Sequence, residues 1–289
     1  MFQIIGIVML FGLVFGSFII FGGNIAVIFS ALPGEVMTIG GAGIASFLIA
    51  NSVPVIKGTG KGFGKVFKGP SWKAGDYRDL LSLLFLLTKT MKSKGVIALE
   101  SHIENPHESS IFSRYPKIMK DHFAVDFICD TLRMMTMNLE DPHQVENAME
   151  AQLEKHHHEA LGPSHALQSL ADALPALGIV AAVLGVIKTM GAITEPPEVL
   201  GEMIGGALVG TFLGVFLAYG IVGPFATRMK SVVDEESAFY RIIRSVLVAH
   251  LHGNAAQISV EIGRGNVPSG AQPSFLELEE ALSNIPAEA

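Results

Sequence analysis

The sequence predicts an all-α integral membrane protein with four transmembrane helices, a large helical cytoplasmic loop between helices 2 and 3, and a cytoplasmic C-terminal helix. Three observations lead to this fold class. Hydrophobic residues make up 49% of the 289 positions and charged residues only 16%, which is unusual for a soluble protein of this size. Four segments are long and apolar enough to cross a bilayer. The lysines and arginines are clustered rather than spread evenly.

The four predicted spans each hold roughly 17 to 25 mainly apolar residues, the number needed to cross about 30 Å of hydrocarbon. The first has no basic residue before it and runs longer than the apolar region of a signal peptide, so we expect it to remain in the mature protein. Glu35 is the only acidic residue in a predicted span, and it falls at the edge of the second. The spans are 4–21, 34–50, 173–190 and 203–226.

The orientation of the spans follows from the basic residues near their ends, because Lys and Arg are retained on the cytoplasmic side. Residues 1–56 contain no Lys or Arg, five lysines follow at positions 57–73, and Arg228 and Lys230 follow the fourth span. Both termini and the long loop are therefore predicted to be cytoplasmic. The predicted domains are 1–56 (helices 1 and 2), 57–170 (cytoplasmic helical domain), 171–228 (helices 3 and 4) and 229–289 (cytoplasmic C-terminal helix and tail).

The cytoplasmic parts are predicted to be helical from their apolar periodicity and their capping residues. Asp76 can cap the first of these helices. Gly162 and Pro163 are expected to end the third, after which Ser164 can cap a helix that continues into the third membrane span. The predicted helices cover 77–94, 117–138, 143–161, 232–252 and 275–282.

The glycine-rich run KGTGKGFGK at 57–65 has some features of a phosphate-binding loop. That loop needs a glycine five positions before Gly60 and a Ser or Thr after Lys61, where this sequence has Val55 and Gly62. We therefore interpret the run as a flexible basic collar at the cytoplasmic face of the membrane.

The sequence predicts no catalytic residue, no enzyme activity and no metal site. His156, His157, His158 and Glu159 are consecutive, and consecutive residues on a helix point about 100° apart, so they cannot converge on one ion. Cys129 is the only cysteine, so we expect a buried, reduced thiol and no intramolecular disulfide. The net charge of −7 and the clustered basic residues do not favour nucleic-acid binding.

Small residues line one side of the third and fourth spans, and such stripes let helices approach closely. They can pack the helices of one chain against each other, or they can bring helices together in an oligomer. We expect a tightly associated bundle or oligomer, in which the third span offers a smooth surface to a partner helix. The helix-packing residues are Gly178 and Gly185 in the third span and Gly206, Gly210 and Gly214 in the fourth.

Thr211 is the polar side chain that we expect at depth in the fourth span. Its hydroxyl can bind an ion, a water molecule or a partner's carboxyl group, or it can donate to a carbonyl of its own helix. Pro175 and Pro224 each remove a backbone donor, which predicts a kink or hinge near the cytoplasmic end of a span.

Five segments form a distinctive pattern: LPALGIVAAVLGV at 174–186, VGTFLGVFLAYGIVGPFAT at 209–227, AGIASFLIAN at 42–51, LESHIENPHESSIFSRYP at 99–116 and PSFLELEE at 273–280. Together they resemble the A subunit of the bacterial flagellar motor stator, the MotA/PomA family, which is related more distantly to the ExbB and TolQ energisers. The resemblance extends over nearly the whole chain, and the four-span layout agrees with it.

This resemblance implies a stator subunit that forms an ion channel with a MotB-type B subunit and couples ion flow to torque on the rotor switch protein FliG. Members of the family form a ring, expected to be pentameric, around a dimer of the B subunit, whose single membrane aspartate binds the ion. That aspartate would account for the lack of an acid at depth in this chain. The implied location is the bacterial inner membrane, among its lipids. The expected ion is H⁺, since Ala182 and the surrounding IVAAVLG are closer to the proton-using branch, and no cofactor is implied.

The resemblance also implies roles for residues of the membrane spans. Thr211 and Ala182 match positions that face the ion path. Pro175 and Pro224 match prolines implicated in coupling protonation to a conformational change.

In the long loop, the acidic torque residue of the family falls on Glu100, and its basic partner, usually arginine, falls on Lys92. Lysine keeps the positive charge but lacks the planar fork of arginine, so bidentate pairing is not expected there. Further candidates for rotor contacts are Lys89, Lys94 and Glu104.

Two alternatives stay open. One is an ExbB/TolQ-like proton-driven energiser of an outer-membrane system, although that group resembles a three-span protein with an outside N-terminus. The other is a structural membrane scaffold without ion flux.

Overall fold

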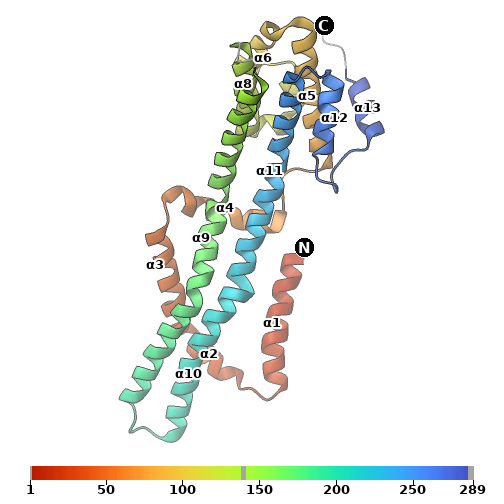
Figure 1. Cartoon of the computed structure of the whole chain (residues 1–289). Coiled ribbons are helices and arrows are strands. Elements are labelled where there is room, and N and C mark those ends of the chain that lie inside the picture. Colours follow the sequence, from red (N-terminus) through yellow and green to blue (C-terminus); the bar gives the residue numbers. More distant parts are fainter. Residues whose placement is uncertain (1, 138–140, 286–289) are drawn as a thin grey trace. The chain divides into compact units, whose positions relative to one another are not determined.

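The computed structural model describes residues 2–137 and 141–285, and all regular elements in them are helical (Figure 1). The chain forms two compact units. The membrane unit consists of Met1–Gly69 and Ala160–Val232, and the polar unit consists of Pro70–Glu159 and Val233–Ala289. Two long helices, α9 (Pro142–Gly191) and α11 (Gly223–Leu251), contribute residues to both units.

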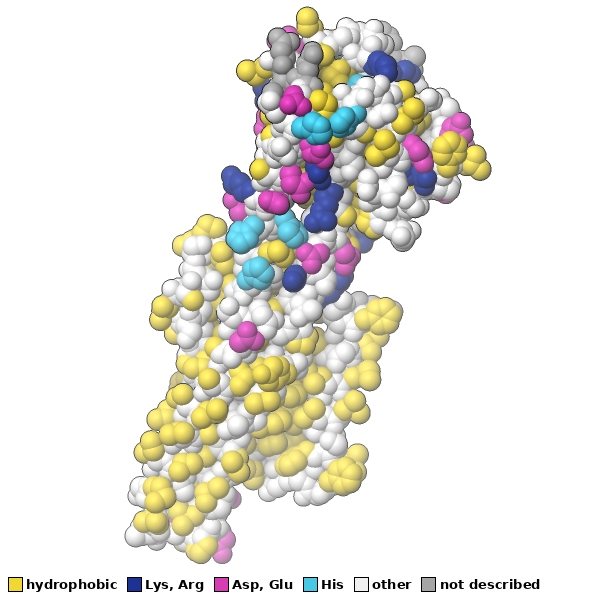
Figure 2. All heavy atoms as spheres, viewed as in Figure 1, with side chains coloured by type: hydrophobic (Ala, Val, Ile, Leu, Met, Phe, Trp, Pro, Cys, Tyr) yellow, Lys and Arg dark blue, Asp and Glu magenta, His cyan; other side chains and the backbone are white. Residues whose placement is uncertain are grey.

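Four helical stretches in the described residues are long and apolar enough to span a membrane: Phe2–Ile20, Ile25–Ala50, Pro142–Gly191 and Pro197–Leu251. Their number agrees with the prediction, and hydrophobic side chains cover the face of the membrane unit seen in Figure 2. Besides α9 and α11, this unit contains α1 (Phe2–Ile20), α2 (Ile25–Glu35), the π-helix η1 (Val36–Gly40), α3 (Gly41–Ala50), α4 (Val53–Lys68), α10 (Pro197–Val215) and the π-helix η4 (Phe216–Val222).

The second span begins at Ile25, earlier than the sequence predicts. Pro33, Gly34 and Glu35 lower the hydropathy of its first half, and Pro33 lies inside the helix just before a π-helical turn. Because α2 has 11 residues, Glu35 lies about 15 Å along the helix from its start at 1.5 Å per residue. The expectation that Glu35 lies at the edge of the second span is therefore wrong: it is the eleventh residue of a helical stretch of 26 residues.

The run predicted to be a flexible collar is part of a helix, α4. Two of its four glycines, Gly58 and Gly62, make room for neighbouring helices. A Cβ atom built on Gly58 would lie 2.8 Å from Pro163 Cγ, and one on Gly62 would lie 2.6 Å from Met229 Cε. Close packing therefore explains Gly58 and Gly62 better than flexibility does.

Gly162 and Pro163 do not end a helix, contrary to the prediction, because α9 continues through them. Pro163 lacks an N–H donor, but its ring packs against Gly58 of α4. Ser164, which the sequence predicts as a cap, lies inside α9, and its hydroxyl donates to the Leu161 carbonyl at 2.8 Å. Tertiary packing thus outweighs the helix-breaking tendency of proline here.

An apolar core holds the polar unit together. Its helix α5 (Ala74–Lys94) buries all of its leucines, and Trp72 stacks on Phe239 with ring centroids 3.8 Å apart. Cys129 lies in this core, where burial raises the pKa of its thiol to about 12, so the predicted buried thiol is confirmed. The other elements of the unit are η2 (Val96–Leu99), α6 (Glu100–Glu104), η3 (Phe112–Arg114), α7 (Pro116–Met119), α8 (His122–Thr136), α12 (Ala256–Gly265) and α13 (Phe275–Ser283).

Capping side chains set several helix starts in the polar unit. The Asp76 carboxylate accepts the N–H of Lys73 at 2.6 Å, and α5 begins slightly before the predicted start. The helix predicted over 117–138 is two helices, because Asp121 accepts the N–H of Ala124 at 2.9 Å and starts α8; its predicted end at residue 138 lies outside the described residues. The predicted acidic helix near the C-terminus is confirmed as α13, whereas α12 was not predicted.

Candidate functional site

The third and fourth spans touch backbone to backbone. A Cβ atom built on Gly178 of α9 would lie 2.8 Å from the carbonyl oxygen of Gly210 and 3.1 Å from Gly214 Cα on α10. A Cβ atom on Gly214 would lie 2.6 Å from the Leu174 carbonyl oxygen. A larger side chain at either glycine would force the two backbones apart. Figure 1 shows this part of α9 running beside α10.

The other predicted packing glycines also face helices of the same chain. A Cβ atom on Gly185 would lie 2.6 Å from Ala207 Cβ of α10, and one on Gly206 would lie 3.8 Å from Ala31 Cβ of α2. The structure thus shows the packing of one chain's own helices. The surface of Gly178 and Gly185 is occupied by α10, so it is not the open surface for a partner helix that we expected.

Glu35 reaches this helix pair from α2. Its Oε2 atom would lie 2.5 Å from a Cβ atom built on Gly210, and Ala181 Cβ would lie 3.2 Å from the same atom. That oxygen is buried without a hydrogen-bond partner in the described residues. Sequence reasoning did not select Glu35 as a site residue because it placed the start of the span too late. The high cost of an acidic side chain at membrane depth is the signal that could have found it.

Ala181 and Gly210 are in contact, and Ala182 and Thr211 are the next residues of their helices. Thr211 and Ala182 therefore lie at about the same level of the helix pair. Because α9 and α10 are antiparallel, one further step along each helix turns both residues to the same side of the pair. The Thr211 hydroxyl makes no hydrogen bond within the described part of the chain, whereas the Thr189 hydroxyl donates to a carbonyl of its own helix at 2.9 Å. Of the two alternatives for Thr211, the structure favours the available hydroxyl.

The two predicted hinge prolines lie on neighbouring turns of the membrane unit. Pro175 leaves the carbonyl of Ala171 without its usual helical donor. Ala171 Cβ would lie 3.9 Å from a Cβ atom on Gly223, the residue before Pro224. The fourth span widens into the π-helix η4 immediately before Gly223, as expected where a proline interrupts the hydrogen-bond ladder. The missing donor at Pro175 and the π-helical turn before Pro224 therefore lie close together.

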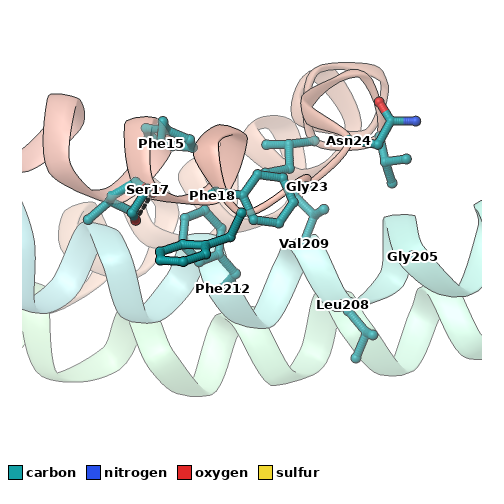
Figure 3. Close-up of a pocket in the computed structure, with 13 residues that line it drawn as sticks. Phe15, Ser17, Phe18, Gly23, Asn24, Gly205, Leu208, Val209 and Phe212 are labelled. Carbon is teal, nitrogen blue, oxygen red and sulfur yellow. Dashed lines mark hydrogen bonds between the residues drawn. The ribbon is translucent and has the colours of Figure 1, made fainter.

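An apolar cavity of about 790 Å³ lies between α1, α2 and α10. Figure 3 shows Phe15, Phe18 and Phe212 along it. The Ser17 hydroxyl at this site donates to the Val14 carbonyl of its own helix at 3.1 Å. Because its walls are apolar and the Ser17 hydroxyl already has a partner, this cavity is unsuited to an ion. Thr211 is not among the residues that line it.

In the polar unit, the two predicted rotor-facing charges are both exposed. Lys92 lies near the end of α5 and Glu100 begins α6. Neither takes part in an ion pair among the described residues. Both charges are therefore available to a partner. Ile97, between them in sequence, is 83% exposed.

An ion-pair network that the sequence analysis missed lies beside these charges. Arg133 of α8 binds Glu104 at 2.7 Å and Asp130 at 2.6 Å, and hydrogen bonding to Arg133 lowers the pKa of Glu104. Glu104, a candidate for rotor contacts, already has a partner in its own chain. Glu104 and Arg133 are 29 residues apart in the sequence, so no local pattern predicts that they pair.

The histidines of α9 point to different neighbours. His156 stacks on Phe123 with ring centroids 3.5 Å apart, and Nε2 of His157 lies 3.3 Å from a carboxylate oxygen of Asp234. Within the described residues, no group of three or more His, Cys, Asp or Glu side chains is arranged to hold a metal ion.

These features define a helical membrane protein whose third and fourth spans form a close-packed pair. Residues 4–95 match the family model described as Motility protein A N-terminal, and residues 120–241 match that of the MotA/TolQ/ExbB proton channel family. The chain belongs to the motility protein A family, a branch of these proton channel proteins. The resemblance drawn from the sequence is confirmed, and membership of a channel family agrees with the prediction that the chain is not an enzyme.

Several relatives match along almost the whole chain. Motility protein A of Escherichia coli is 39% identical over 98% of this chain and 95% of its own length. The chemotaxis protein LafT of Vibrio parahaemolyticus is 35% identical over 97% of this chain and 98% of its own length.

Two solved structures share the fold. The structure of C. jejuni MotAB has a TM-score of 0.70 at 18% identity and covers 92% of this chain and 95% of its own. The flagellar MotAB stator complex from Bacillus subtilis has a TM-score of 0.66 at 22% identity, with coverage of 89% and 92%.

Proposed function

We propose that this chain is the A-type stator subunit of a bacterial flagellar motor, in which ion flow is converted into torque. The match of residues 4–95 to the motility protein N-terminal model supports this function over that of an ExbB/TolQ-like energiser. The names of the relatives, motility protein A and chemotaxis protein LafT, support it as well.

The proposed assembly is a ring of this chain, expected to be pentameric, around a dimer of a MotB-type subunit. The solved relatives are MotAB complexes, which supports this pairing. The partner's membrane aspartate would bind the ion, expected to be H⁺, with no other cofactor. The assembly would lie in the bacterial inner membrane, in contact with its lipids, with both termini cytoplasmic. The polar unit would then meet the rotor switch protein FliG through Lys92 and Glu100.

One observation carries the proposed ion path: the Thr211 hydroxyl has no partner in the described residues and lies at the level of Ala182. A free hydroxyl at membrane depth can bind an ion, a water molecule or a partner's carboxyl group. The adjoining irregular turns at Pro175 and Pro224 would allow the helix pair to change shape when the partner's acid is protonated.

Complementation of a bacterium that lacks its own stator genes tests the proposed function. Co-expression of this chain with the B-type subunit of the same organism should restore swimming, and a protonophore should abolish it at any external sodium concentration. Assembly without swimming would favour a structural scaffold. Swimming that follows external sodium at fixed pH would overturn the proposed ion.

A further inference from the structure

Two residues separate helix α4 from the end of the second span at Ala50, and α4 presents three different faces. One face packs on the membrane unit itself. Thr59 and Val66 are buried there, and Val66 belongs to an apolar cluster with Leu167 of α9 and Met229 of α11. This helix is therefore fixed to two of the long helices of the unit.

A second face of α4 is basic. Its lysines are spaced by four, four and three residues, so they lie within about 80° of one another at 100° per residue. All four are exposed. No acidic residue occurs between Glu35 and Asp76, so α4 itself carries positive charges and no negative ones. The lysine row consists of Lys57, Lys61, Lys65 and Lys68.

The third face of α4 is apolar and partly uncovered. Phe63 and Phe67 are 41% and 42% exposed, although each ring also contacts Phe225, with centroids 5.7 and 5.6 Å away. By helical position, Phe67 points about 120° and Phe63 about 160° away from the centre of the lysine row. Water would face apolar rings here unless hydrocarbon covered them.

The geometry points to a lipid-binding role: α4 lies in the membrane interface, where its lysine row binds the headgroups of anionic phospholipids and Phe63 and Phe67 enter the acyl-chain boundary. Interfacial helices combine an apolar face with a basic one in this way, and juxtamembrane basic clusters are attracted to anionic leaflets. The apolar face on the far side of the same helix and the nearby end of the second span select a lipid surface over a soluble phosphate compound. This inference extends the lipid contact of the proposed function to one lipid class and one helix.

The purified complex of this chain with its B-type subunit can test the inference by native mass spectrometry. The complex is titrated with phosphatidylglycerol and, separately, with phosphatidylcholine. The variant with all four lysines of the row changed to Gln should bind phosphatidylglycerol at least tenfold more weakly, since one lysine near an anionic surface contributes about fivefold. Binding of phosphatidylcholine should not change.

Three further samples keep the result specific. The row changed to Arg should bind as the native complex does, because it keeps the charge. The pair Lys120→Gln and Lys155→Gln, in the polar unit, should also bind normally. The pair Lys57→Gln and Lys61→Gln provides a milder change if the fourfold variant does not assemble. The inference would be overturned if the Gln variants kept the native preference for phosphatidylglycerol. It would also be overturned if millimolar inorganic phosphate displaced the bound phosphatidylglycerol. Because lipid binding is measured without motility, its failure would leave the stator function standing.

Discussion

At the scale of single residues, Gly210 lies where three helices meet. Its missing side chain leaves room for the Glu35 carboxylate and for Ala181. An added methyl group would overpack this site, and overpacking costs about 1–3 kcal/mol. We expect Gly210→Ala to lower the amount of assembled complex measured after membrane extraction.

Glu35→Ala in the same chain should partly restore assembly, because it removes the atoms that the new methyl group meets. Glu35→Ala alone provides the control for the loss of the acid. If Glu35→Ala gives no relief, the contact between Glu35 and Gly210 is not what limits assembly.

Lys92 and Glu100 are exposed charges, and any one exposed pair contributes about 0.2–1 kcal/mol. Lys92→Glu alone should therefore slow swimming without abolishing it. The combination with Glu100→Lys should impair swimming far more, because both rotor contacts would then be repulsive. Swimming speed on soft agar and in tracked cells measures this, with Lys120→Glu as the control. Full motility of the double variant would refute the rotor-facing assignment.

His250 of α11 is buried in the polar unit, and burial lowers its pKa, with a smaller contribution from the charge of Lys92. The folded state therefore holds a neutral imidazole, while the unfolded chain binds a proton below about pH 6.5. Stability of this region should fall as the pH falls through that value toward the lowered folded pKa. When the pH is lowered from 7.5 to 5.5, hydrogen exchange near the end of α11 should become faster relative to the chemical exchange rate at each pH. The substitution His250→Gln should remove this pH dependence. An equal dependence in both proteins would rule out His250 as its source.

At the scale of elements, the irregular turns at Pro175 and Pro224 adjoin each other in the membrane unit. Pro175→Ala restores the donor that the Ala171 carbonyl lacks, and so it should stiffen α9. We expect the complex to assemble at its native level while swimming stalls. Pro142→Ala is a matched control, since Pro142 is the first residue of the same helix and no helical hydrogen bond depends on its nitrogen. Loss of assembly in Pro175→Ala would mean that this proline is only structural.

Some of the helical elements can be predicted from the sequence and others cannot. Three of the four spans follow from hydropathy, because lipid requires long apolar helices with few interruptions. The start of the second was misplaced because Pro33 and Glu35 break its apolar run. The glycines of α4 and the Gly162–Pro163 pair suggest loops, and only contacts with distant helices explain why helices form there. Tertiary packing of this kind leaves no local signal.

The candidate site divides in the same way. Family motifs propose Thr211, Ala182 and the two prolines as site residues, but the sequence holds no sign that Ala171 lies beside Gly223. The pairing of Glu104 with Arg133 likewise depends on the fold. The family motifs thus propose which side chains take part, and only the structure shows which of them meet.

At the scale of the whole molecule, the candidate ion path belongs to the membrane unit and the proposed rotor-facing charges belong to the polar unit. The helices α9 and α11 contribute to both. Conversion of ion flow into torque would therefore require that a change at the α9–α10 pair alters the work done through Lys92 and Glu100. In our proposal, this series of events begins at the hydroxyl of Thr211.

The most direct measurement is the rotation of single tethered motors driven by Thr211→Val and Thr211→Ser stators at equal levels of assembled complex. Valine matches threonine in shape but lacks the hydroxyl, whereas serine keeps it. Our account predicts that the valine stator assembles but produces little or no rotation, and that the serine stator rotates. Rotation of the valine stator at the native speed would contradict the proposal that the Thr211 hydroxyl lines the ion path.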